Sequence, residues 1–317
     1  MNERVPPSVA AVICTRGDRP EFLREAIASI VEQDYPGPVE VMVVFDRAEP
    51  DESLTEPVAG REGAAGPARR VRVMRNDRAP GLPAGRNAGI LATESELVGF
   101  CDDDDLWLPD KLTHQVAALR ERPRALFASC GAETVYTDRT VTCLWRKPQI
   151  AHVDLLHSRI KEACADSFLV RREAFFGPVG LFAEDIPGGF GEDYEMLLRA
   201  ARHSPIVYVP VVGVRVRVHG RTSHFTGHWA TIATACEWLL AGYPEFSTER
   251  RGFARIAGQI GIAWGMFGMR RNALRWARRS FLASPLEIRS YVVAALALGL
   301  VPRPWVQRRL DAAGATS

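Results

Sequence analysis

Apolar residues in the first two thirds of the chain form short runs that alternate with segments of helical periodicity. Residues 9–14 and 97–101 are continuously apolar, as expected for strands covered on both faces, and residues 39–45 form a further strand candidate. After the first of these runs, residues 22–31 repeat apolar side chains in steps of four, which indicates a helix. Strands that alternate with helices predict βαβ units and a mainly parallel α/β sheet.

The beginning of the first helix and the end of the α/β pattern can both be placed. Asp18 and Glu21 stand three residues apart around Pro20, which is the spacing of a capping box. From residue 228 onward the pattern predicts helices only, and the sequence therefore divides into an α/β domain over 1–227 and a small all-helical subdomain over 228–317. The expected helices of the second part cover residues 228–242, 250–266, 269–283 and 287–300.

Polar residues follow three of the predicted strands. Thr15, Asp46 and Asp102 each stand where a strand ends. In parallel sheets ligands bind beyond the carboxyl ends of the strands, so we expect these side chains to converge on one edge.

Four consecutive aspartates, Asp102 to Asp105, follow the strand at residues 97–101. Like charges at this density are costly without a cation among them, and oxygen ligands favour Mg²⁺ or Mn²⁺. In an extended segment alternate side chains share a face, so Asp102 and Asp104 are predicted to point together and Asp103 away. The alternative is a solvated acidic turn that caps the helix beginning at Pro109.

Five ordered motifs carry a resemblance to a known family. Residues 81–112 read GLPAGRNAGILATESELVGFCDDDDLWLPDKL, which combines an Arg-Asn-x-Gly helix with Asp-x-Asp-Asp, Trp and Pro. Together they resemble the family 2 glycosyltransferases over residues 8–224. The other four motifs are ICTRGDRPEFLREAIASIVEQDYP, VVFD, SFLVRREAFFGPVGLF and GEDYEMLLRAARHSPIVYVP.

The resemblance implies an inverting glycosyltransferase of GT-A fold, with a nucleotide-sugar half over residues 1–110 and an acceptor half over 111–227. Thr15, Arg16 and Asp46 would then line the pocket for the nucleotide base and ribose. Asp46 would accept a hydrogen bond from a uracil-like imide, which favours a UDP-sugar. The family's Asp-Asp-Gly-Ser is replaced by Asp-Arg-Ala-Glu at 46–49, and the alternative for Asp46 is a strand-end turn residue.

The same resemblance implies a diphosphate and metal site. Arg86 would approach the diphosphate, unless it is a surface helix arginine, and Asp103 would lie among the donor-binding residues. Asp104 would bind Mn²⁺ or Mg²⁺, and Asp102 the metal or the ribose. His219, in an Arg-x-His element that begins at residue 217, would supply a nitrogen ligand or contact the diphosphate, or would be structural. Asp105 would assist these residues, and Trp107 is expected to be a packing anchor.

A second carboxylate site is implied at Glu192 and Asp193, after a glycine-rich segment. By resemblance Asp193 is the catalytic base that removes the proton of the acceptor hydroxyl. Glu192 would orient the acceptor or cap the following helix. The alternative for both is a pair of first-turn acids favoured by the helix dipole.

Two other functions are compatible with parts of this pattern. A sugar-1-phosphate nucleotidylyltransferase would share the sheet and the metal, but it would need a glycine-rich basic loop directly after the first strand, where only Arg16 and Gly17 stand. A nucleotide-sugar-binding protein without turnover would not need Asp193. The acceptor, whether a glycan, a lipid-linked sugar or a small molecule, is not encoded in any readable motif.

Charge adds one further expectation. The net charge is +2, but residues 250–310 contain twelve arginines and a single acid, Glu287. This tail is either a solvated face or a surface for peripheral membrane contact. We expect no nucleic-acid partner because no recognised module accompanies the arginines. The arginines of one predicted helix are 270, 271, 275, 278 and 279, beside Leu274, Trp276, Phe281 and Leu282.

The expected location is the cytoplasm, with peripheral attachment to the inner face of the membrane as an option. Residues 1–7 contain no apolar segment of a signal peptide, and the apolar stretch at 291–301 is about half a membrane span. Six cysteines without close pairs suit a reducing compartment.

Overall fold

The structure is a computed structural model that describes residues 5–55, 67–218 and 227–312. The chain forms two compact units. Unit 1 contains Met1–His152, Ile160–Glu184 and Met196–Arg217, and unit 2 contains Val153–Arg159, Asp185–Glu195 and Val218–Ser317. Unit 2 thus takes in two segments that precede the expected helical subdomain, and the functional boundary at residue 227 stays a prediction.

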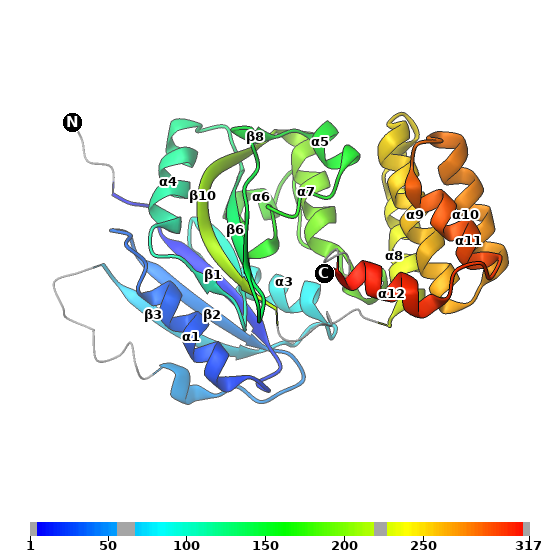
Figure 1. Ribbon diagram of the computed structural model, residues 1–317. Coiled ribbons are helices and arrows are strands. Elements are labelled where there is room, and N and C mark those ends of the chain that lie inside the picture. The colour runs from blue at the N-terminus through cyan, green and yellow to red at the C-terminus, as the bar shows by residue number, and fades with distance from the viewer. Residues whose placement is uncertain (1–4, 56–66, 219–226, 313–317) are drawn as a thin grey trace. The chain divides into compact units, whose positions relative to one another are not determined.

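Unit 1 is built on a mixed, mainly parallel sheet flanked by helices (Figure 1), as predicted. The strand order is β3-β2-β1-β4-β9-β6-β10-β5, with β7 beside β6 and β8 beside β10. The strands are β1 (Val9–Thr15), β2 (Val39–Phe45), β3 (Arg69–Arg75), β4 (Leu97–Asp102), β5 (Leu106–Trp107), β6 (Phe127–Val135), β7 (Thr140–Cys143), β8 (Gln149–Ile150), β9 (Leu169–Arg171) and β10 (Ile206–Arg217).

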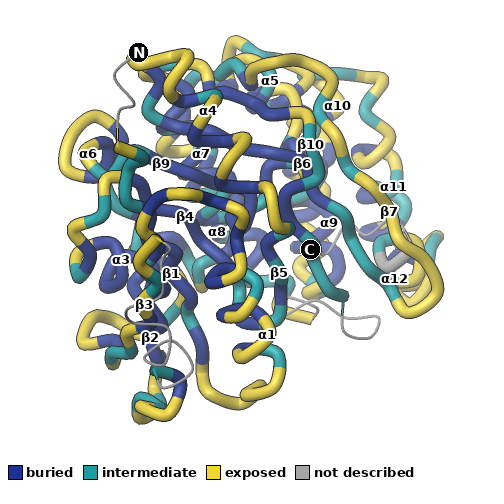
Figure 2. Tube along the Cα trace, turned by 90° about the vertical axis from the view of Figure 1, so that its left-hand side faces the viewer, coloured by how far each residue is buried: buried dark blue, intermediate teal, exposed yellow. Residues whose placement is uncertain are grey.

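Strands β3, β2, β1 and β4 pair in parallel, and β9 runs antiparallel between β4 and β6. The central strands are buried on both sides, which is why they are continuously apolar (Figure 2). Helix α1 (Pro20–Val31) packs on β2 and β5, and helix α3 (Leu82–Ala92) packs on β1 and β2. Gly89 of α3 lies so close to the sheet that a Cβ there would be 2.4 Å from Val12 Cγ1, so the helix requires glycine at this contact.

The first helix does not begin with the predicted capping box. Its N-cap is Arg19, and no side chain caps the helix. Pro20 at the first helical position supplies the required backbone angle and lacks an N–H to satisfy. Asp18 is therefore not needed as a cap, and the Arg19 side chain extends to the acidic quartet instead.

Of the remaining helices of unit 1, α4 (Lys111–Glu121) packs on β6 and β10, whereas α6 (Arg172–Phe175) has only four residues. Helices α5 (His152–His157) and α7 (Glu192–His203) each have residues in both units.

From Trp229 onward unit 2 is helical, as predicted. Helix α9 packs against α8, α10 and α11 through small residues, since Gly261 and Gly265 face Val293 and Leu296 of α11. None of the helices in the described parts of the chain combines the length and the apolar character that a membrane span requires. The helices are α8 (Trp229–Gly242), α9 (Arg250–Phe267), α10 (Arg270–Ala283), α11 (Ile288–Ala297) and α12 (Arg303–Ala312), the last of which was not predicted.

Trp276 belongs to the core of unit 2 and not to its surface. It is 4% exposed, and its Nε1 donates to Glu237 Oε1 at 2.8 Å. Trp264 Nε1 donates to the same oxygen at 2.8 Å. Of the apolar residues named beside the arginines of this helix, Trp276 therefore faces the core, because that side of α10 packs against its neighbours.

Candidate active site

The carboxyl ends of three neighbouring parallel strands carry the polar residues singled out in the sequence. Between β1 and β2, Thr15 is opposite Phe45, so that Asp46 follows at the same edge. Between β1 and β4, Cys14 is opposite Asp102. The Asp46 N–H also donates to the Thr15 carbonyl at 2.7 Å. The predicted convergence on one edge is confirmed.

The acidic quartet forms a turn and not an extended segment. The Asp105 N–H donates to the Asp102 carbonyl at 3.2 Å. Arg19 contacts the two acids between them, with Nη2 at 3.2 Å from Asp103 Oδ1 and Nη1 hydrogen-bonded to Asp104. The expectation that Asp103 points away from Asp104 is therefore wrong, because side chains alternate only along an extended backbone.

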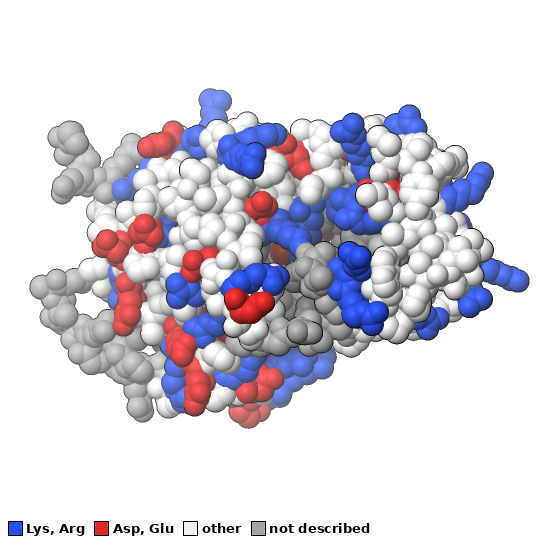
Figure 3. Space-filling view, in the orientation of Figure 1, with Lys and Arg blue, Asp and Glu red and all other residues white. Residues whose placement is uncertain are grey.

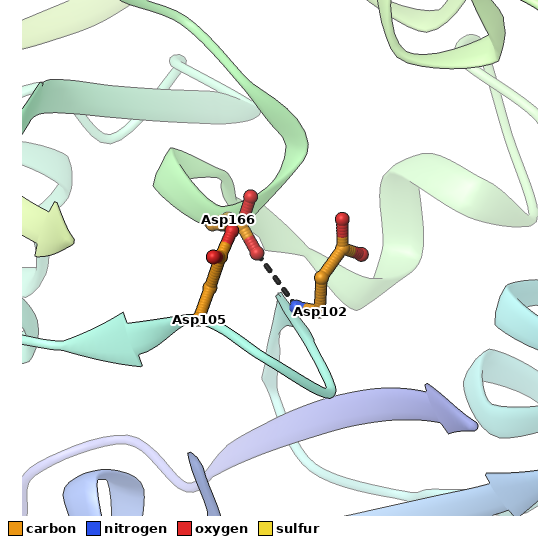
Figure 4. A group of neighbouring side chains, drawn as sticks. All are labelled: Asp102, Asp105 and Asp166. Atoms are coloured by element: carbon orange, nitrogen blue, oxygen red, sulfur yellow. Dashed lines mark hydrogen bonds between the residues drawn. The ribbon is translucent and has the colours of Figure 1, made fainter. Parts of the chain in front are cut away.

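Three carboxylates from two distant parts of the chain form an acidic cluster. Oxygen atoms of Asp102, Asp105 and Asp166 lie within 4.8 Å of one another (Figure 4). Asp166 lies in the short 3₁₀ helix Ala165–Ser167 before β9, and its Oδ1 accepts from the Asp102 N–H at 2.6 Å. Asp105 Oδ1 accepts from the Arg217 N–H at the end of β10 at 2.8 Å.

Crowding of these acids in a buried place disfavours their charged forms. Burial, together with the charge of Asp102, raises the pKa of Asp166 to about 7. Burial and the charge of Asp166 raise the pKa of Asp105 well above its usual value. Burial also raises the pKa of Asp103, against the hydrogen bond from Thr15. A set of oxygen ligands that is costly to ionise without a cation fits Mg²⁺ or Mn²⁺.

Arg86 is a buried counter-cation of this cluster. It is 2% exposed, its Nη2 donates to Asp102 Oδ1 at 2.9 Å, and its guanidinium lies 5.9 Å and 5.5 Å from the ring centroids of Phe100 and Phe182. The alternative of a surface helix arginine is wrong. A planar cation fixed beside the acidic cluster is suited to phosphate oxygens.

A second buried cation, Lys111, was not predicted. Its Nζ has no hydrogen-bond partner within the described residues and lies 3.6 Å from the ring centroid of Trp107. Burial lowers the pKa of Lys111 to about 8. Trp107 is itself buried and donates from Nε1 to the Phe100 carbonyl at 3.0 Å, so its expected role as a packing anchor is confirmed.

Thr15 and Asp46 hold the loops at the strand ends. Thr15 Oγ1 donates to Asp103 Oδ2 at 2.6 Å. Asp46 Oδ1 accepts from Asn76 Nδ2 at 2.8 Å, and its Oδ2 accepts from the Gly81 N–H at 3.2 Å. Asp46 therefore has the structural role of a strand-end turn residue, and its nucleotide contact stays a prediction, as does that of the exposed Arg16.

The predicted base belongs to a separate ion pair within unit 2. Arg159 Nη2 lies 3.0 Å from both Oδ1 and Oδ2 of Asp193. Asp193 Oδ1 also accepts from the Tyr194 N–H at 2.7 Å, and Glu192 is buried in the same first turn of α7. The charge of Asp193 raises the pKa of Arg159. Arg159 was missed because the sequence around it has no clear pattern.

Arg159 and Tyr194 also line a cavity of about 30 Å³ within unit 2. Arg255 and Gln259 of α9 line it as well, and Arg255 Nη2 donates to the Tyr194 hydroxyl at 3.0 Å. Arg159 thus both contacts Asp193 and lines this cavity, most of whose other lining residues are apolar.

His219 and its neighbours lie outside the described residues. The strand that leads to it, β10, ends at Arg217, whose N–H is bonded to Asp105 as described above. The ligand role of His219 stays a prediction.

Comparison with known proteins agrees with this architecture. Residues 10–176 match the family model for Glycosyl transferase family 2. This is more than half of the chain, and the chain belongs to that family.

Relatives and solved structures point in the same direction. An uncharacterized glycosyltransferase of Rickettsia felis is 25% identical over 207 residues, which cover 62% of this chain and 32% of the relative. An uncharacterized glycosyltransferase of Rickettsia prowazekii is 24% identical over 228 residues, which cover 69% of this chain and 67% of the relative. The chain thus spans about a third of the first of these relatives.

Among solved structures, residues 1–349 of TarS from S. aureus superpose with a TM-score of 0.60 at 16% identity, covering 97% of this chain and 92% of that one. The mannosyltransferase PcManGT from Pyrobaculum calidifontis, in complex with GDP-Man and Mn²⁺, has a TM-score of 0.55 at 18% identity, covering 98% and 89%. At these identities the likeness concerns the fold.

Proposed function

We propose that this chain is a nucleotide-sugar-dependent glycosyltransferase that moves a sugar from a nucleoside-diphosphate sugar to an acceptor hydroxyl with inversion. The observation that carries the proposal is the acidic cluster of Asp102, Asp105 and Asp166 with Arg86 beside it, at the carboxyl edge of the sheet. Family membership supports the same activity.

The cluster provides the donor half of the mechanism. Asp102 belongs both to the Asp-x-Asp pair with Asp104 and to the acidic cluster with Asp105 and Asp166. It is therefore the first candidate ligand for a metal ion. A divalent cation held there would neutralise charge that develops on the departing nucleoside diphosphate. Arg86, fixed by its bond to Asp102, would contact the diphosphate.

Asp193 provides the acceptor half. In a single displacement the acceptor oxygen bonds to the anomeric carbon, the bond to the diphosphate breaks, and Asp193 takes the hydroxyl proton. Arg159 contacts both carboxylate oxygens of Asp193 and would orient them. Glu192, in the same turn, would position the acceptor.

UDP is the favoured nucleotide because Asp46 is the family residue expected to meet a uracil-like imide. TarS has been crystallised with UDP-GlcNAc, which supports this choice at the level of the shared fold. The acceptor hydroxyl would belong to a glycan, a lipid-linked sugar or a small molecule.

The test is a panel of nucleotide sugars incubated with the full chain and Mn²⁺, Mg²⁺ or a chelator. We expect release of nucleoside diphosphate that is fastest with UDP-sugars and that stops with the chelator. In a parallel reaction with added pyrophosphate, its consumption with formation of nucleoside triphosphate and sugar 1-phosphate would indicate a nucleotidylyltransferase instead. Binding of nucleotide sugar without turnover for any acceptor class would indicate a binding protein.

A further inference from the structure

Exposed large hydrophobic side chains are concentrated in the last part of unit 2. Of the eighteen such side chains in the described parts of the chain, eleven lie between residues 267 and 305. A folded monomer exposes single apolar residues throughout its surface, but a local concentration indicates an interaction site.

Five of these residues, among them the most exposed one, Leu286, lie at or near the turn between α10 and α11, which we call the α10–α11 corner. Leu286 and Ile288 are 86% and 73% exposed. Phe281 and Tyr291 pack edge to face with centroids 5.8 Å apart, and the Tyr291 hydroxyl donates to the Pro285 carbonyl at 2.7 Å. The corner consists of Phe281, Leu282, Leu286, Ile288 and Tyr291. It is an ordered projection and not a loose turn.

Positive charge leads up to this corner. Arg271, Arg275 and Arg278 are exposed on α10, and their spacing places them on the same side of the helix as Leu282. The single acid of residues 250–310, Glu287, is ion-paired with Arg289 at 2.7 Å. Figure 3 shows blue side chains around the edge of this unit, while red side chains gather over unit 1.

We propose that the α10–α11 corner docks on an anionic lipid membrane, with Leu286 and Ile288 entering the interface and the arginines of α10 contacting headgroups. Aliphatic side chains can insert at the boundary between lipid headgroups and acyl chains, and the neighbouring arginines can contact anionic headgroups above it. A second copy of this chain would oppose arginines to arginines, and nucleic acid would offer Leu286 and Ile288 no apolar surface.

The test is flotation of the full chain with vesicles of phosphatidylcholine, with and without phosphatidylglycerol. We expect binding only to the anionic vesicles, weakened by salt. The variant L286S/I288S should lower the partition coefficient about tenfold or more, and R275Q/R278Q should do so by about tenfold at low salt. The matched control V5S/L91S removes two exposed aliphatic side chains from unit 1 and should bind as the wild type does.

Thermal unfolding of these variants should match the wild type because the replaced side chains are exposed. Donor hydrolysis in solution by L286S/I288S should also be unchanged, so failure of docking would leave the proposed function standing. No flotation of the wild type, or equal flotation of L286S/I288S, overturns the proposal. Sedimentation that reveals a dimer broken by L286S/I288S, without lipid binding, would assign the corner to self-association and overturn it too.

Discussion

The two carboxylate sites of the molecule are built in opposite ways. In unit 1 several aspartates crowd together, and burial raises the pKa of Asp166 and Asp105 even with Arg86 beside Asp102. In unit 2 the guanidinium of Arg159 contacts both carboxylate oxygens of Asp193. A site with excess acid is suited to bind a cation, whereas a carboxylate contacted on both oxygens by one guanidinium is suited to be held in a fixed orientation.

The largest effect should follow from removal of the base. We expect D193N to lower the transfer rate by about 10³- to 10⁴-fold, because the amide cannot accept the acceptor proton. Donor affinity, measured by titration of a nucleotide sugar, should be unchanged. The control D185N replaces an exposed aspartate of the same unit and should transfer normally. Normal transfer by D193N would show that the base is another residue.

In the absence of metal, the acidic cluster should make the free energy of unfolding depend on pH. The pKa of Asp166 is raised from 3.8 to about 7, so between these values the native state holds a proton that the unfolded state has lost. The wild type should therefore lose stability relative to D166N as pH rises through this window, by up to about 4 kcal/mol. Urea unfolding of both proteins with a chelator measures the difference. A difference that does not change with pH would mean that Asp166 is ionised throughout.

Metal binding should depend on the aspartate that both ligand sets share. We expect D102N to weaken Mn²⁺ binding, measured by calorimetry, by at least about 100-fold, while the exposed D110N has no effect. Comparison of D104A with D166N then assigns the remaining ligand, since Asp104 comes from the linear motif and Asp166 from the folded cluster. Unaltered Mn²⁺ binding by D102N would show that the metal ion is not bound at this edge of the sheet.

Local sequence patterns correctly predicted the elements of the fold that depend on local apolar periodicity and parallel strand pairing. The buried strands and the helices after residue 228 follow from apolar periodicity, and the edge that gathers Thr15, Asp46 and Asp102 follows from parallel pairing. Asp166 could not be placed in the same way, because it stands 64 residues from Asp102 and reaches it only through the antiparallel strand β9. Its one local signal is an acid placed shortly before an apolar run.

The directions of side chains could not be predicted from the sequence either. Arg19 could be read as part of a helix start, but not as a cation aimed at Asp103 and Asp104. The apolar residues of α10 gave no indication that Trp276 packs inward on Glu237 while Leu282 stays exposed. Such choices depend on which neighbours a helix meets, and the sequence of one helix does not contain that information.

The smallest effect should come from the partner of the base, and it tests whether Asp193 needs orientation or only charge. R159Q removes the guanidinium that contacts both oxygens of Asp193, and we expect kcat to fall about tenfold with the donor KM unchanged. Lysine restores the charge but not the planar group, so R159K should recover only part of kcat. The control R255Q removes the bond to the Tyr194 hydroxyl and leaves the ion pair in place. Full recovery of kcat in R159K would show that Arg159 acts through its charge alone. A wild-type kcat in R159Q would show that the contact with Arg159 does not orient the carboxylate of Asp193.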